Sequence, residues 1–379
     1  MTTPHRPADP ARPVDSAHPF DTAHPLDTAL AFLGDRLRVD EPLAALCTYK
    51  VGGAAARFVV VQDESELNRI AEALAQAGAF EREAVQPELS IHVIGRGSNL
   101  LVADAGLPGL VLQLGDGFAE IEILDSQASE SQESQPPKQG ESDQQGSNIL
   151  RAGAMASLPV VARKSVAAAL TGFEWAVGVP GSIGGAVRMN AGGHGADMAA
   201  SLTGVHVLDL ETGENRWVTT AVLELGYRHS TITSTQIVLH AELHLASGDR
   251  ALGEQRLAEI VSWRREHQPG GHNAGSVFRN PPGDSAGRLI EAANCRGLRV
   301  GSAEVSTKHS NFIQTDSAGS ADDVLEVMAQ VVAQVGNHSG VQLRAETVLL
   351  GFTDEQRSRL RWPNTTTPSL DDDPSEQAL

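Results

Sequence analysis

Short apolar runs of four to eight residues recur along the chain from Thr48 onward, separated by polar and glycine-rich stretches. Runs of this length, bounded by turn-forming residues, are typical of buried strands. They predict strands at residues 57–61, 91–94, 109–114, 119–124, 148–153, 204–210 and 236–243. Residues 119–124 alternate between apolar and charged side chains, so we expect one face of that strand to be solvated.

Apolar residues at helical spacing predict helices between and after these strands. Asp63 and Ser320 are residue types that cap helices, and each precedes an apolar stripe. The expected helices follow Asp63 with Leu67, Ile70, Ala71 and Leu74 on one face, cover residues 158–169, include Leu257 to Arg264, and follow Ser320 up to a stop at Gly336. Strands and helices do not alternate regularly, so the pattern favours an α+β fold over one doubly wound sheet.

Three polar segments lack the apolar residues needed for a packed core. Residues 1–28 are rich in Pro, His, Asp and Ala, residues 125–147 are a polar low-complexity run, and residues 363–379 are acidic. Because so little apolar surface cannot offset the entropy of ordering, we expect these segments to be disordered. Predicted strands flank residues 125–147, so we interpret this run as a loop extension at a strand–strand turn, with a linker between domains as the alternative.

Charge and cysteine content narrow the partners and the compartment. The formal net charge of -19 disfavours binding to nucleic acid and to anionic membranes. No apolar run reaches the ~20 residues needed to span a bilayer, and the N-terminus has no apolar signal segment. Cys47 and Cys295 form no disulfide framework, and no Cys/His cluster has the spacing of a metal site. We therefore expect a cytoplasmic protein that binds no metal.

Two glycine-rich loops could hold a dinucleotide. The first, Gly95-Arg-Gly-Ser-Asn-Leu100, follows a predicted strand, but Leu100 occupies the third glycine position of a Rossmann fingerprint. The second, residues 178–193, crowds small residues around Pro180. Small residues let backbone N–H groups approach an anion closely. A tight turn for the first loop and a packed glycine corner for the second are the structural alternatives.

Five motifs in a fixed order resemble the UDP-N-acetylenolpyruvoylglucosamine reductase family, also called UDP-N-acetylmuramate dehydrogenases. The motifs cover residues 48–53, 95–100, 172–185, 227–230 and 274–281, and the similarity runs from about residue 40 to 352, interrupted at 125–147. The resemblance implies an FAD-binding fold of the p-cresol methylhydroxylase type, made of two α+β subdomains, followed by a smaller α+β substrate-binding domain.

This resemblance implies a division of the chain and a set of cofactor contacts. Residues 1–40 would be a disordered extension, 41–233 the FAD-binding region with subdomains 41–113 and 114–233, 234–352 the substrate-binding domain, and 353–379 an acidic tail. The implied FAD-binding residues are Tyr49, Val51, Gly52, Gly53, Gly95, Arg96, Gly97, Ser98, Asn99, Leu100, Gly178, Pro180, Gly181, Ser182, Gly184, Gly185, Asn190 and Gly192.

The reaction implied by the resemblance reduces an enolpyruvyl ether of a UDP-sugar to a lactyl ether. NADPH would reduce FAD, and FAD would then pass hydride to the substrate. Arg228 would stabilise the enolate, Ser276 would donate a proton to carbon, and Glu346 would assist as an acid or hydrogen-bond partner. Tyr227 and Asn280 would join these three in binding the substrate, and Arg264, Arg279 and Lys308 are weaker candidates for its diphosphate.

The sequence departs from some family members in two places. Those members carry a Tyr-bearing loop between the Tyr-Arg and Gly-Ser motifs, whereas here 47 residues without Tyr separate Arg228 from Ser276, as in the shorter type. Gly193 and His194 stand where Ala and an aromatic residue are usual. Two other functions stay open: a flavin oxidase of the same fold and a non-catalytic FAD or UDP-sugar module. The oligomeric state is not indicated.

Overall fold

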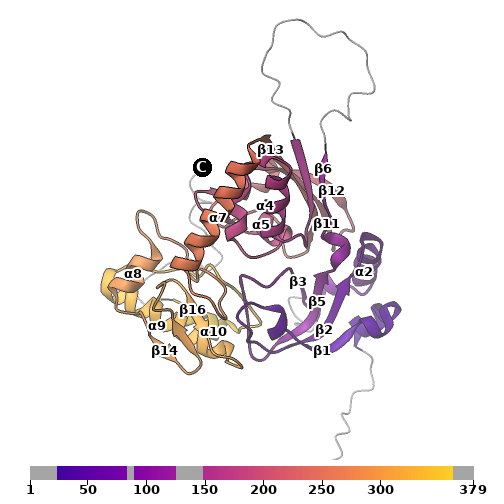
Figure 1. Ribbon diagram of the computed structural model, residues 1–379. Helices are drawn as coiled ribbons and strands as arrows, with labels where there is room; N and C mark the ends of the chain where they lie inside the picture. The colour runs from indigo at the N-terminus through magenta and orange to yellow at the C-terminus, as the bar shows by residue number, and fades with distance from the viewer. Residues whose placement is uncertain (1–23, 83–88, 125–147, 362–379) are drawn as a thin grey trace, which may run out of the picture.

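The computed structural model describes residues 24–82, 89–124 and 148–361, which form three packed units of mixed helix and strand (Figure 1). The first unit contains the indigo and most purple elements, the second the purple β6 with the magenta and first orange elements, and the third the later orange and yellow elements. This arrangement agrees with the α+β fold that the apolar pattern predicts.

The first unit is built on a sheet in the order β1-β2-β5-β3, in which β2, β5 and β3 are parallel and β1 is antiparallel to β2. Its elements are α1 (Pro25–Ala29), η1 (Ala31–Arg36), β1 (Arg38–Pro42), η2 (Ala44–Leu46), β2 (Ala54–Val61), α2 (Glu64–Gln76), α3 (Ala79–Arg82), β3 (Ile91–Ile94) and β5 (Leu107–Leu114). The Asp63 carboxylate accepts from the Glu66 amide at 2.9 Å, so the predicted cap of α2 is confirmed. Leu67, Ile70, Ala71 and Leu74 are buried on one face, as the spacing predicts.

The start of the chain is more ordered than its composition suggests. Leu26, Leu30 and Leu33 are buried in the same core cluster as α2, and Asp27 forms an ion pair with Arg57 of β2. Residues 24–40 therefore belong to the packed unit, which corrects the predicted disordered extension over 1–40. The three leucines recur at helical spacing across α1 and η1, and the prolines around them mask this signal. Residues 1–23 lie outside the described part.

The second unit contains a larger sheet in the order β12-β11-β13-β7-β6, with β8 paired to β13. Its elements are η4 (Asp116–Phe118), β6 (Ile121–Leu124), β7 (Asn148–Gly153), α4 (Leu158–Ala167), β8 (Leu170–Thr171), η6 (Glu174–Gly178), α5 (Ile183–Arg188), β9 (Gly192–Gly193), β10 (Ala196–Asp197), η7 (Met198–Ala200), β11 (Leu202–Asp209), β12 (Asn215–Thr219), α6 (Thr220–Leu223), β13 (Gln236–Ser247) and α7 (Arg250–His267). Helices α4, α5 and α7 lie together on one side of this sheet (Figure 1).

Strand β13 and helix α7 belong to this second unit. β13 pairs with β11 on one side and β7 on the other, and α7 packs on α4 and η6. This corrects the predicted domain boundary at residue 234, because an apolar strand and an amphipathic helix suit either unit until the pairing is known. We propose that the substrate-binding unit begins after α7.

The insertion that separates two predicted strands joins sheet neighbours. β6 and β7 are antiparallel, with Leu124 opposite Ile149. Residues 125–147 themselves lie outside the described part. The flanking register agrees with the interpretation of a turn between strands.

The third unit packs α8 (Ala286–Ala292) and α9 (Ala321–Ser339) against a small sheet of β14 (Arg299–Val300), β15 (Ala303–Val305) and β16 (Ile313–Thr315). Ser320 Oγ accepts from the Asp323 amide, which confirms this N-cap. α9 continues past the predicted stop at Gly336 and ends at Gly340, whose φ of 72° suits glycine. Gly336 is instead a buried position where the helix packs.

Backbone pairing and one carboxylate attach this third unit to the first. β17 (Val348–Leu350) runs parallel to β4 (Leu100–Val102). Asp104 accepts hydrogen bonds from Ser320 Oγ at 2.6 Å and from the first two amides of α9 at 2.9 and 3.1 Å. Because β4 directly follows the first glycine loop, its pairing with β17 fixes the segment before β17 relative to that loop.

Part of the predicted acidic tail is also ordered. α10 (Asp354–Ser358) begins with a capping box between Thr353 and Gln356, and Leu360 is buried in the core of the third unit. This corrects the boundary at residue 353, while residues 362–379 lie outside the described part. A four-residue capping signal is easily missed beside an acidic run.

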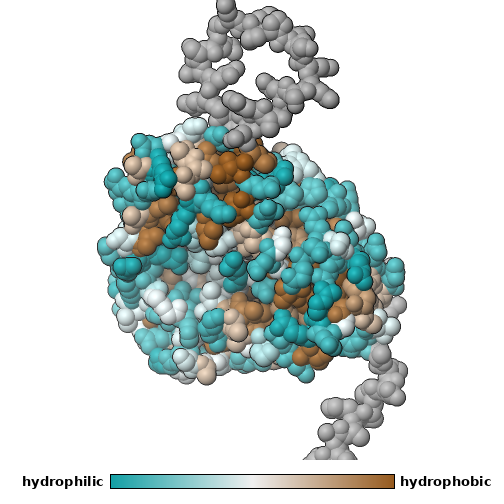
Figure 2. All heavy atoms as spheres, turned by 45° about the vertical axis from the view of Figure 1, so that its right-hand side comes forward, coloured by the Kyte–Doolittle hydropathy of each residue, from teal (hydrophilic) through white to brown (hydrophobic). Residues whose placement is uncertain are grey.

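The outer surface is mostly hydrophilic on the face shown in Figure 2, with separate hydrophobic patches. Within the described ranges, no helix combines the length and apolar character needed to cross a membrane.

Candidate active site

A cavity of about 350 Å³ lies where the three units meet. Both glycine loops, helix α5, the end of α7 and segments before β17 contribute to its wall. The lining residues that the sequence predicts are Gly95, Arg96, Gly97, Ser98, Asn99, Leu100, Gly178, Pro180, Gly181, Ser182, Gly185, Gly192, Arg228, Ser276 and Glu346, together with the weaker candidate Arg264. The two loops are far apart in sequence, and the structure brings them to one site.

The two glycine loops pack directly on each other. A Cβ on Gly95 would lie 2.5 Å from Ser182 Oγ, and a Cβ on Gly181 would lie 2.9 Å from Ser98 Oγ. Gly97 has φ +60° and faces the Leu46 carbonyl oxygen at 2.1 Å from the same hypothetical atom. Only residues without a side chain allow this close approach, which forms a narrow cradle at the cavity wall.

Backbone amides in the first loop are available to a ligand. Within the described ranges, the N–H groups of residues 96–99 donate to no protein acceptor. Arg96 adds a guanidinium that is exposed at the cavity and donates to the Met155 carbonyl oxygen at 3.2 Å. Successive free amides beside a cation suit a phosphate or diphosphate group. The donor set therefore fits the diphosphate of a dinucleotide cofactor.

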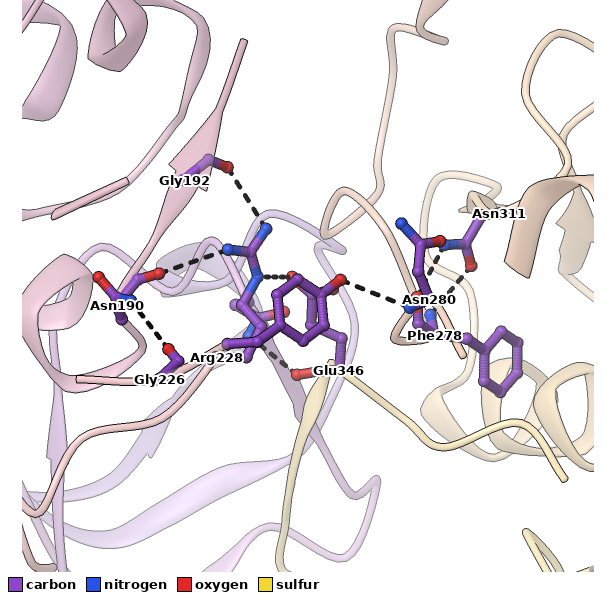
Figure 3. A network of polar contacts seen from close by, with 10 residues as sticks. Asn190, Gly192, Gly226, Arg228, Phe278, Asn280, Asn311 and Glu346 are labelled. Carbon is purple, nitrogen blue, oxygen red and sulfur yellow. Dashed lines mark hydrogen bonds and ion pairs between the residues drawn. The ribbon is translucent and has the colours of Figure 1, made fainter. Parts of the chain in front are cut away.

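Arg228 enters the cavity from a strained turn. Gly226 and His229 exchange backbone hydrogen bonds of 3.2 Å, and Arg228 between them has φ +57°. Its guanidinium donates to the carbonyl oxygens of Asn190 at 3.4 Å and Gly192 at 3.3 Å. Figure 3 shows these oxygens on one side of the guanidinium and Glu346 on the other. A left-handed conformation at a non-glycine residue is costly and is often found at functional sites.

Glu346 forms an ion pair with Arg228 from the opposite side of the guanidinium. Arg228 Nε donates to Glu346 Oε1 at 2.5 Å, and the two side chains are 19% and 11% exposed. The Glu346 carbonyl oxygen accepts from Asn99 Nδ2 at 3.0 Å, next to the point where β17 joins β4. The first glycine loop and Glu346 are therefore held in one register.

Ser276 reaches the same cavity through the third unit. The Glu346 amide donates to the Val277 carbonyl oxygen at 2.7 Å, and Ser276 directly precedes Val277 in the chain. Arg228, Ser276 and Glu346, which come from three distant stretches, all line one cavity. The predicted reaction needs these three side chains at one cavity, and their catalytic roles stay a prediction.

Tyr227 and Asn280 lie beside the lining rather than in it. Tyr227 is 53% exposed, its ring contacts the Arg228 guanidinium, and its hydroxyl accepts from the Asn280 amide at 3.4 Å. Asn280 Oδ1 accepts from the first amide of α8 at 3.0 Å. These residues bridge the second and third units next to the cavity.

Six of the predicted cofactor residues lie outside the lining: Tyr49, Val51, Gly52, Gly53, Gly184 and Asn190. Tyr49 is fully buried in the core of the third unit, where burial raises its pKa. Asn190 Nδ2 donates to Asp197 Oδ2 and to the Gly226 carbonyl oxygen, and Gly53 packs on the Asp104 backbone. None of these six is among the residues that line the cavity, so their contact with FAD stays a prediction.

Sequence reasoning missed several lining residues, including Arg188, His92, Gln268 and Phe312. Burial lowers the pKa of His92, which favours its neutral form. Arg188 lies within the second glycine-rich segment, at the end of α5, and an isolated arginine there carries no motif signal. Of the weaker candidates, Arg264 lines the cavity, whereas Arg279 and Lys308 do not.

The charge of the lining is opposite to that of the whole chain. Arg96, Arg188, Arg228 and Arg264 face the cavity with Glu346 as the one acidic lining residue in the described part. Within those same ranges, no group of three or more His, Cys, Asp and Glu side chains is arranged to hold a metal ion. A positive cavity beside a glycine cradle, where three units meet, fits the dinucleotide-binding oxidoreductase that the resemblance implies.

Comparison with known proteins gives the family. Residues 55–219 match the FAD binding domain, and residues 267–350 match the C-terminal domain of UDP-N-acetylenolpyruvoylglucosamine reductase. The chain belongs to the UDP-N-acetylenolpyruvoylglucosamine reductase family, which confirms the resemblance, and FAD is its cofactor.

Individual relatives support this assignment over most of the chain. The enzyme of that name from Agathobacter rectalis is 37% identical over 314 residues, covering 82% of this chain and 93% of the relative. The one from Synechococcus sp. (strain RCC307) is 38% identical over 324 residues, covering 84% and 96%. The crystal structure of the Thermus caldophilus reductase superposes with a TM-score of 0.64 at 32% identity, covering 83% of this chain and 99% of that one.

Proposed function

We propose that this enzyme reduces UDP-N-acetylglucosamine enolpyruvate to UDP-N-acetylmuramate for peptidoglycan synthesis in the cytoplasm, with NADPH as the reductant. The family assignment supports this reaction over a flavin oxidase or a binding module. The observation that carries the proposal is the meeting of Arg228, Ser276 and Glu346 at one cavity beside the glycine cradle.

The glycine cradle would hold the cofactor. The amides of residues 96–99 and the Arg96 guanidinium are the groups available to its diphosphate. FAD, when bound, supplies the hydride chemistry, and the protein supplies position and charge.

Arg228 would stabilise the negative charge that develops on the substrate. Hydride addition to the terminal carbon of the enolpyruvyl group makes its carboxylate and neighbouring carbon enolate-like. A guanidinium stays protonated and binds carboxylate through two N–H groups. Carbonyl oxygens of Asn190 and Gly192 and the carboxylate of Glu346 already fix its orientation. Fixed donors of this kind contribute about 3–4 kcal/mol to transition-state stabilisation.

Ser276 would donate the proton that completes the reduction. Its hydroxyl carries a proton and no charge, so it can donate that proton to the enolate carbon. Glu346 would hold Arg228 and contact the enol as a hydrogen-bond partner. We expect the proton taken from Ser276 to be replaced from solvent through the open side of the cavity.

The test separates the two half-reactions by stopped-flow absorbance of the flavin. Ser276→Ala should leave flavin reduction by NADPH within about twofold of wild type, and it should slow reoxidation by the enolpyruvyl sugar at least about 100-fold. Ser262→Ala, an exposed serine on α7 that donates to Glu266, is the matched control. Equal slowing of both half-reactions by Ser276→Ala would contradict the proton-donor role.

A further inference from the structure

Arg188 is a cation at the cavity that the proposed reaction does not use. It is the last residue of α5, and its guanidinium is exposed at the cavity wall. One guanidinium nitrogen donates to the Thr233 carbonyl oxygen at 2.6 Å, and the Arg188 carbonyl oxygen accepts from Ser230 Oγ at 2.8 Å. The first contact holds the side chain, and the second the backbone, of Arg188 against the segment before β13.

Arg188 differs from Arg228 in having no acidic neighbour. Arg228 is paired with Glu346, whereas no carboxylate in the described ranges forms an ion pair with Arg188. Surrounding protein partly desolvates the guanidinium and lowers the pKa of Arg188, while the side chain stays exposed toward the cavity. A cation at a cavity wall that has no acidic partner in the described ranges can bind a negatively charged group of a ligand. The cavity is the side from which a ligand can reach it.

The position of Arg188 indicates which ligand this is. Ser182, where the two glycine loops touch, is the N-cap of α5, and the six residues of the helix carry the wall about 8 Å further to Arg188. Two residues later, the Asn190 carbonyl oxygen accepts from Arg228. Arg188 therefore lies between the cradle and the proposed catalytic group, along the wall that a dinucleotide would follow.

We propose that Arg188 is a further cofactor-binding residue whose guanidinium binds an oxygen-bearing, negatively charged group of FAD. Two parts of FAD carry this chemistry: the diphosphate, and the N1–C2 carbonyl edge of the reduced flavin. The proposal depends on FAD as the cofactor and is independent of the sugar substrate, so its test needs no turnover.

The experiment compares Arg188→Gln and Arg188→Lys with a matched control. Gln keeps a donor for the Thr233 carbonyl oxygen but removes the charge, and Lys keeps the charge. Arg163→Gln is the control because Arg163 is an exposed arginine on α4 that also donates to a backbone carbonyl oxygen, at 3.0 Å, outside the cavity. FAD affinity is measured by fluorescence titration of apoprotein, and the midpoint potential of bound flavin by spectroelectrochemistry.

Binding to the diphosphate and binding to the reduced flavin give different results. If Arg188 binds the diphosphate, Arg188→Gln should weaken binding of oxidised FAD about 10- to 100-fold, since a hydrogen bond to a charged group contributes that much. If it binds the reduced flavin, oxidised FAD should bind normally, and the potential should fall by about 30 mV for each tenfold loss of preference for reduced FAD. In either case Arg188→Lys should recover part of the effect, and Arg163→Gln should show none.

One result overturns the proposal: Arg188→Gln with FAD affinity within twofold of wild type and an unchanged midpoint potential. Far-UV circular dichroism of each apoprotein separates misfolding from lost contact. Should Arg188→Gln fail to fold, Arg188→Lys against Arg163→Lys still decides, because a shorter cation should weaken FAD binding or shift the potential only at position 188.

Discussion

Replacing Glu346 by glutamine tests the ion pair that closes the centre of the cavity. The variant keeps the size of the side chain and one oxygen that can accept from Arg228 Nε, but it removes the negative charge. Arg228 retains the carbonyl oxygens of Asn190 and Gly192 as acceptors. The guanidinium of Arg228 therefore keeps hydrogen-bond acceptors but loses its counter-charge.

The loss of unfolding free energy in Glu346→Gln lies between two limits. Breaking a buried ion pair by removing one partner costs about 3–5 kcal/mol, whereas an exposed pair contributes about 0–1 kcal/mol. The side chains of Arg228 and Glu346 are 19% and 11% exposed, and the remaining acceptors and the glutamine oxygen offset part of the loss. We expect the free energy of unfolding to fall by about 1–2 kcal/mol.

Urea unfolding of the FAD-saturated enzyme measures this change. Glu304→Gln is the matched control, because Glu304 pairs with Arg299 at 2.9 Å with both side chains more exposed, and its loss should cost less than about 0.5 kcal/mol. Glu346→Gln should also slow flavin reoxidation by the substrate more than flavin reduction by NADPH. An unfolding free energy equal to that of the control would refute the reasoning that the pair is partly buried and oriented.

Three other predictions concern the cradle, the unit interface and pH. Gly97→Ala should cost about 2 kcal/mol or more in thermal unfolding and weaken FAD binding, since a Cβ there would meet the Leu46 carbonyl oxygen at 2.1 Å. Gly340→Ala is the control and should cost only about 1 kcal/mol, because Gly340 is left-handed with φ 72° and a methyl group added there would have no atom within 4 Å. Asp104→Ala should lower the free energy of unfolding by about 1–2 kcal/mol in urea, with Asp104→Asn intermediate, because Asp104 accepts three hydrogen bonds at the start of α9. Burial lowers the pKa of His92, His240 and His309 below 6.5, so near pH 6 the unfolded chain binds more protons than the folded chain. The urea midpoint of unfolding should therefore fall as pH decreases from about 7 to 5. A midpoint that stays constant or rises over this range would contradict the prediction.

Local signals in the sequence were sufficient for most strands and helix starts. Asp63 and Ser320 cap helices because their side chains accept amide hydrogen bonds three residues later, and both partners are encoded locally. Strand β13 was recognised as a strand, but its neighbours β11 and β7 are set by pairing across long stretches of chain. A boundary placed from sequence therefore fell on the wrong side of it.

The site was predicted as a set of residues but not as a geometry. Spacing and small side chains identified both glycine loops, and resemblance supplied Arg228, Ser276 and Glu346. Neither could show that Tyr49 points into the core of the third unit. Arg188 was missed because a single cation has no motif, and its meaning comes only from the cavity that it faces.

The parallel pairing of β4 with β17 has a consequence for dividing the chain. Leu100–Val102 obtains its strand partner from the last ordered strand, Val348–Leu350. A fragment that stopped after α7 would leave the open edge of β4 and the apolar side chains Tyr49, Val51 and Leu101 uncovered. Unpaired strand edges next to apolar surface promote self-association. Expressed alone, the FAD-binding part should form aggregates, and adding the missing C-terminal part as a separate chain should restore a discrete species.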